Sequence, residues 1–115
     1  MKQRRLILQK LQLEFVSDKE LYQCYMPFLQ QGGLFVRSKE QYNIGTEILL
    51  EVLLPDSLEY TEINGQVAWL TPANAQNGTP AGIGICFIKD PEQVRNQIEK
   101  SIGRFLNSSE PTFSM

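Results

Sequence analysis

Five short apolar segments, each closed by residues that favour turns, divide most of this sequence. Two of them, Lys10–Val16 and Glu62–Leu70, alternate apolar and polar residues, which is the period of a half-buried strand. The other three, Gly33–Ser38, Thr46–Leu54 and Ala81–Ile88, are bounded by glycine, proline, asparagine or aspartate. Strands this short and this closely spaced predict a mainly β fold, such as a small antiparallel barrel.

One later segment has the signals of an amphipathic helix. Asp90 is expected to be its N-cap, with Pro91 at the first helical position and Gln93 completing a capping box. Gly103 predicts that this helix ends near Leu106 or Asn107. The apolar residues at helical spacing are Val94, Ile98, Ile102, Phe105 and Leu106. Earlier in the chain, Ser17 or Asp18 could cap a short helical turn before Pro27.

The length of 115 residues is typical of one domain, and 42% apolar residues with 21% charged residues predict a folded chain. We expect residues 1–106 to form that single domain. Residues 107–115 are polar apart from Phe113 and Met115, which predicts a flexible C-terminal tail.

The charge and composition exclude several classes of function. A net charge of −2 argues against a nucleic-acid partner, which usually requires a basic face. No apolar run approaches the roughly 18 residues that would insert into a membrane, so the expected location is the cytoplasm. Cys24 and Cys86 are then expected to be free and buried.

The residues that most enzymes need are missing. The chain has no histidine, which excludes a Ser-His-Asp or Cys-His nucleophile and any histidine-ligated metal. No P-loop is present, and the glycines of the GIGIC segment lie within an expected strand. The sequence therefore predicts a non-catalytic protein with no cofactor and no metal.

Three sequence segments, QQGGLFVRS, INGQVAWLTP and PAGIGICF, occur in this order, and the chain resembles the PilZ domain family. The resemblance extends from about Lys10 to the helix after Asp90 and is closest to the single-domain PilZ proteins of type IV pilus biogenesis. It implies a small six-stranded antiparallel PilZ-type β-barrel with a C-terminal α-helix.

Typical members of this family bind cyclic di-GMP through Asp/Asn-x-Ser-x-x-Gly at a turn and Arg-x-x-x-Arg before the first strand. In this chain Phe28 and Gln30 stand at the Asp/Asn and Ser positions of a degenerate nucleotide turn, and only Gly33 matches. The arginine pair is also absent, since Arg4 and Arg5 are followed four residues later by Leu8 and Gln9. Because each lost charged contact costs about 1.5–3 kcal/mol, no tight binding of cyclic di-GMP is expected.

Relatives that lack these motifs are implied to be adaptors in pilus assembly. Their implied partners are the pilus assembly ATPase and an EAL- or GGDEF-domain signalling protein. Two alternatives stay open: a cyclic di-GMP receptor with a degenerate site, and an oligonucleotide-binding barrel, which the acidic balance opposes.

The segment LYQCYMPFL is the first candidate for a partner-binding surface. It gathers Tyr22, Tyr25, Met26 and Phe28, residue types that are enriched in interface cores. The alternative, favoured for Met26 and Phe28, is that they close one end of the barrel. Phe113 in the tail is the second candidate, against the alternative of a disordered end. We expect Trp69, on the apolar face of its strand, to be a core residue.

Overall fold

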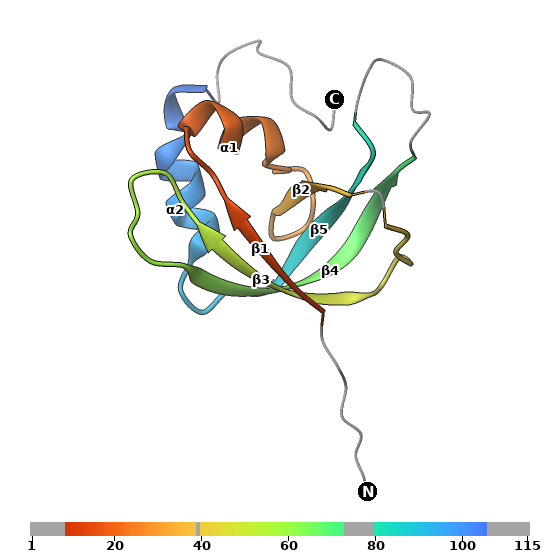
Figure 1. The fold of residues 1–115 in the computed structure, drawn as a ribbon. Helices are drawn as coiled ribbons and strands as arrows, with labels where there is room; N and C mark the ends of the chain where they lie inside the picture. The colour runs from red at the N-terminus through yellow and green to blue at the C-terminus, as the bar shows by residue number, and fades with distance from the viewer. Residues whose placement is uncertain (1–8, 39, 73–79, 106–115) are drawn as a thin grey trace, which may run out of the picture.

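The computed structural model describes residues 9–38, 40–72 and 80–105, which form one five-stranded sheet with two α-helices (Figure 1). In chain order the elements are β1 (Gln9–Glu14), α1 (Asp18–Cys24), β2 (Gly33–Arg37), β3 (Glu47–Leu53), β4 (Thr61–Thr71), β5 (Gly82–Lys89) and α2 (Val94–Ser101), followed by a 3-10 turn at Gly103–Phe105. Each of the five strands predicted from sequence is present, with bounds that differ from the prediction by at most two residues.

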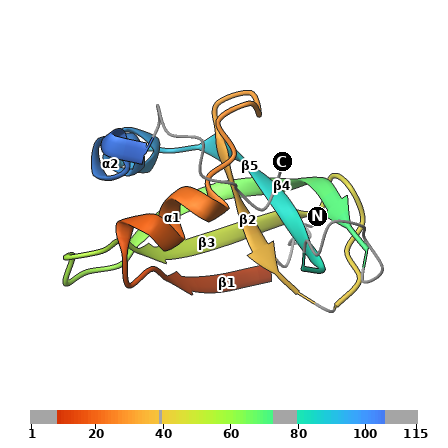
Figure 2. The same ribbon diagram turned by 90° about the horizontal axis from the view of Figure 1, so that it is seen from above.

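The strands lie in the order β1-β3-β4-β5-β2, in a sheet that curls around α1 (Figure 2). The expectation of a purely antiparallel sheet is wrong, because β1 pairs in parallel with β3. The expected six strands are not confirmed, since the described residues form five. After β1 the chain passes through α1 to β2 at the opposite edge before β3 returns beside β1, and such a long crossover permits parallel neighbours.

The core lies inside the curl, and β5, an interior strand between β4 and β2, passes through it. Four consecutive residues of β5, 82–85, are buried, so both faces of this strand are covered. The helix α2 packs at one end of the sheet. Val94 and Ile98 of the helix and Ile102, its C-cap, are buried, as the helical spacing predicted. Both cysteines are free, with Cys24 buried and Cys86 half-buried. Within the described residues, no helix is long and apolar enough to cross a membrane.

The first turn of α1 is fixed by a reciprocal pair of side-chain bonds. Ser17 is the N-cap, and its Oγ accepts a hydrogen bond of 3.1 Å from the backbone N–H of Glu20. The carboxylate of Glu20 in turn accepts the N–H of Val16 at 3.1 Å. Ser17, one of the two caps predicted from sequence, therefore acts in a variant of the capping box.

The start of α2 differs from the predicted capping box. Gln93 has a left-handed backbone with φ of 56°, so the helix begins only at Val94. Asp90 caps the helix from outside, because its two carboxylate oxygens accept the N–H groups of Val94 at 2.6 Å and Arg95 at 2.9 Å. The α-helix ends at Ser101, earlier than predicted, and residues 106 and 107 lie outside the described part of the chain.

Asp90→Ala is expected to lower the free energy of unfolding by about 1–2 kcal/mol, because both N–H groups at the helix start lose their acceptor. Asp90→Asn retains only one acceptor oxygen and should lose less. Urea denaturation of the three proteins measures the difference. Equal stability of the alanine variant and the parent chain would contradict this capping role.

Candidate functional site

The turn between α1 and β2 is tied to the sheet by backbone hydrogen bonds on both sides. Tyr25 forms an antiparallel bridge with Leu34, and the N–H of Met26 donates to the carbonyl of Gly33 at 2.9 Å. On the other side, the N–H of Phe87 in β5 donates to the carbonyl of Gly32 at 3.0 Å. The turn is therefore held as part of the sheet.

The two glycines of this turn are required for different physical reasons. Gly32 has a φ of +83°, a conformation that side chains disfavour. Gly33 has no positive φ, but a Cβ at this position would lie 2.4 Å from the carbonyl oxygen of Ile85. The first glycine is needed for its backbone angle and the second for the closeness of β5.

An aromatic pair lies beside the turn and reaches the surface. The rings of Phe28 and Trp69 meet edge to face, with centroids 5.8 Å apart. Phe28 remains 53% exposed, whereas Met26, two residues earlier, is fully buried. A Cβ on Gly84 would lie 2.7 Å from Cβ of Trp69 and 2.8 Å from the sulfur of Met26, so only glycine permits this packing.

The sequence prediction that Trp69 is a core residue holds only in part, because Trp69 packs against the core but is not fully buried. Val67 pairs with Ile85 and Trp69 pairs with Gly84, so the register shifts between these two residues of β4. This bulge turns Trp69 to the face of the sheet opposite Val67, where it is only half-buried. A second register shift lies between Asn64 and Gly65, where β5 has the extra residue, Ile88.

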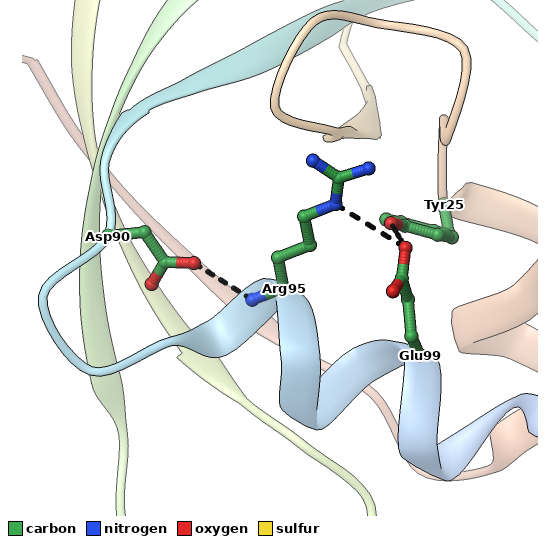
Figure 3. A network of polar contacts seen from close by, with 4 residues as sticks. All are labelled: Tyr25, Asp90, Arg95 and Glu99. Atoms are coloured by element: carbon green, nitrogen blue, oxygen red, sulfur yellow. Dashed lines mark hydrogen bonds and ion pairs between the residues drawn. The ribbon is translucent and has the colours of Figure 1, made fainter.

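Below the turn, a polar network joins α2 to Tyr25 (Figure 3). The hydroxyl of Tyr25 donates to Glu99 at 2.5 Å, and Nε of Arg95 lies 3.4 Å from the same carboxylate oxygen. A Cβ on Gly32 would lie 3.3 Å from both Cδ and Nε of Arg95, so the arginine side chain packs against the turn itself. Burial raises the pKa of Tyr25 to about 12, and the hydrogen bond to Glu99 acts in the same direction.

A family model for the PilZ domain matches residues 1–104 of the chain. The chain belongs to the PilZ domain family. Domains of this family are generally non-catalytic and interact with proteins in cyclic di-GMP-related signalling. A comparison with curated proteins gave no significant match. The match covers nearly the whole length of the 115 residues.

The correspondence of this turn with the nucleotide motif of typical PilZ domains stays a prediction. Gly33, the predicted match, is buried, and Phe28, at the predicted Asp/Asn position, is exposed. Gln30 is exposed at the serine position. The arginine motif would fall among residues 1–8, which lie outside the described residues.

The candidate partner residues of this PilZ domain separate into buried and exposed ones. Tyr25 and Met26 are 1% and 0% exposed, so they support the turn from within. Tyr22 is half-buried, and its ring stacks on Phe105 with centroids 5.3 Å apart. Phe28 is the most exposed of the four, and Phe113 lies outside the described part of the chain.

Arg95 and Glu99 are neighbours of the turn that the sequence did not predict. Their spacing of four residues predicts only an ion pair along the helix, with nothing to indicate that both reach Tyr25, which lies 70 or more positions earlier. Among the described residues, no group of three acidic or cysteine side chains could hold a metal ion.

A cleft of about 340 Å³ opens on another side of the domain, between the two edge strands. It is lined by residues 12–14 of β1 and the following Phe15, by Glu20, Gln23 and Cys24 of α1, and by residues 35–37 of β2. Burial, followed by the nearby charge of Glu20, raises the pKa of the Cys24 thiol to about 11. The thiol is therefore protonated at neutral pH, which makes it a poor nucleophile.

Replacing Tyr25 with phenylalanine tests the network. At neutral pH we expect a loss of about 1–2 kcal/mol in the free energy of unfolding, because Glu99 loses a hydrogen-bond donor. The parent chain should also lose stability as the pH rises from about 10 to about 12, since the unfolded chain then releases the Tyr25 proton while the folded chain retains it. Tyr25→Phe should make this loss shallower in urea titrations at each pH; parallel curves would contradict the assignment.

Proposed function

We propose that this PilZ protein is a non-catalytic regulator of type IV pilus assembly that acts by protein–protein contact. Its partners in this proposal are the pilus assembly ATPase and an EAL- or GGDEF-domain signalling protein, and it does not itself bind cyclic di-GMP tightly. In this proposal the protein acts in the cytoplasm.

The observation that carries the proposal is the exposed Phe28 ring at the former nucleotide turn. Phenylalanine offers no acceptor for the N–H groups of guanine, whereas an exposed aromatic ring packed on Trp69 has the character of an interface anchor. Tyr22 and Phe113 are the further contact residues of the proposal. Tyr25 and Met26 contribute by holding the turn in place.

One observation favours the alternative function, a cyclic di-GMP receptor with a degenerate site. Arg95 lies against Gly32, so an arginine does reach the turn, although from α2 rather than from the N-terminal motif. Its guanidinium is already paired with Glu99, which reduces what it can offer to a phosphate.

Isothermal titration calorimetry with cyclic di-GMP distinguishes the two functions. For the adaptor we expect no binding at micromolar ligand, whereas a dissociation constant of about 1 μM would establish the receptor instead. In the receptor case, Arg95→Ala should weaken that binding.

Co-purification of the tagged protein from its own cells tests the partners. We expect a pilus assembly ATPase or an EAL-domain protein to be retained, and the binding to be lost on Tyr22→Ala or on deletion of the residues after Asn107. If both variants bind as the parent does, these contact residues are wrong. If neither partner is retained by the parent chain, the adaptor proposal fails.

A further inference from the structure

The strand β1 lies at one margin of the sheet (Figure 2), and none of the described strands pairs with its outer edge. The N–H of Phe15, just past the strand, donates to the carbonyl of Leu53 at 3.0 Å, so the odd-numbered residues direct their backbone groups toward β3. In an extended strand, alternate residues direct theirs to the opposite edge. Lys10, Gln12 and Glu14 therefore present N–H and C=O groups at the open edge.

The polar side chains of β1 do little to block this edge. The ammonium of Lys10 lies 3.2 Å from Glu51 of β3, and the amide of Gln12 donates to the same residue at 2.9 Å. Glu14 accepts a hydrogen bond from Tyr60, in the connection between β3 and β4. All three side chains are thus directed toward groups of their own chain. The strand contains no proline and no bulge, which are two common means of protecting an edge.

We propose that β1 pairs with β1 of a second copy of this chain, antiparallel about a two-fold axis at Gln12. The dimer would join two five-stranded sheets into one continuous sheet. This self-association is a separate property from the pilus partners proposed above and does not depend on them.

The register follows from the backbone directions and the charges. Only pairs of even-numbered residues can exchange hydrogen bonds across the open edges, and an axis at Gln12 satisfies this condition along the whole strand. This axis sets Lys10 of each copy opposite Glu14 of the other copy, so two Lys–Glu pairs form. An axis at Lys10 or at Glu14 would instead set like charges opposite each other, which is destabilising. An axis at Leu11 or at Leu13 would also pair even-numbered residues, but it would set Gln12 opposite Lys10 or Glu14 and form no Lys–Glu pair.

The same register matches the apolar face of the strand. It places Leu11 of each copy opposite Leu13 of the other copy, so two leucine pairs form. Both leucines pack against the core but remain half-buried. Pairing would cover their exposed parts, so the inner and the outer face of β1 are both complementary to themselves. Such a self-complementary patch is what a two-fold dimer requires.

The decisive test uses charge reversal of the full-length chain in sedimentation equilibrium at low salt. The parent chain is expected to dimerise with a dissociation constant in the micromolar range, since an interface of one strand pair is small. Lys10→Glu alone and Glu14→Lys alone should each dimerise at least about tenfold more weakly, because each sets like charges opposite each other. An equimolar mixture of these two variants should form a heterodimer, because all four charges are then complementary.

A second pair of variants examines the backbone contact. Gln12→Pro removes an N–H at the two-fold axis without removing a bond to β3, since Gln12 faces the open edge, so we expect the dimer to be lost. Gln12→Val loses the same side-chain bond to Glu51 but keeps the N–H, and it should dimerise as the parent does. Urea denaturation of each variant verifies that the monomer is folded.

Three results would overturn the proposal. The first is a parent chain that stays monomeric up to several hundred micromolar. The second is a dimer that persists unchanged in Gln12→Pro. The third is a mixture of the two charge variants that associates no better than either variant alone.

Discussion

Gly33→Ala is expected to lower the free energy of unfolding by about 3 kcal/mol, the largest effect on stability anticipated here. The added Cβ would lie 2.4 Å from the carbonyl oxygen of Ile85 and 2.7 Å from Cδ1 of Leu29. The carbonyl belongs to the backbone of the central strand β5, so relief requires β2 and the turn to move away from it. A loss of this size is a large fraction of the stability of a typical domain.

Gly103→Ala is the matched control, because nothing lies within 4 Å of the Cβ that it would add. This variant should be as stable as the parent chain, or more stable by up to about 1 kcal/mol, because alanine restricts the unfolded chain. Urea denaturation measures both variants. Equal stability of Gly33→Ala and Gly103→Ala would show that close packing does not fix the turn.

Phe28→Ala is expected to weaken binding of the proposed pilus partner by about 30-fold, which corresponds to about 2 kcal/mol for an aromatic anchor at an interface. The free energy of unfolding should fall by only about 1 kcal/mol, since half of the ring is already exposed to water. The expected signature is a large loss of binding in a chain that remains folded. Surface plasmon resonance with the purified partner measures the first quantity, and urea denaturation measures the second.

Leu58→Ala provides the control for this experiment. Leu58 is 98% exposed in the connection between β3 and β4, so its loss should change neither stability nor binding. If Phe28→Ala binds the partner as tightly as Leu58→Ala does, the exposed aromatic pair is not the contact surface.

The strands of this domain could be predicted because each carries its own local signal. Alternation in β1 and β4 and turn residues around β2, β3 and β5 determine where the chain is extended. They do not determine which strands become neighbours. The parallel pairing of β1 with β3 depends on the path of the chain through α1 and β2. The residues within the two strands do not determine that path.

Side-chain positions were predicted less well where the backbone departs from regular alternation. Trp69 falls on the predicted apolar face only if β4 has no irregularity, and the bulge after Val67 reverses its direction. Between Tyr25 and Phe28 the chain is neither helix nor strand, so no period separates the buried residues from the exposed one. The contact of Arg95 with Gly32 likewise depends on the docking of α2, which follows from the tertiary fold.

The strand order also determines when each part of the chain can become stable. The three central strands, β3, β4 and β5, are consecutive in the chain and can form an antiparallel meander from local contacts. In contrast, Gln9 pairs with Ile48 and Gly33 pairs with Cys86, at separations of 39 and 53 positions. Because closing longer loops costs more entropy, the two edges should dock last during folding. Because β1 is synthesised before β3, it must remain unpaired until β3 is available.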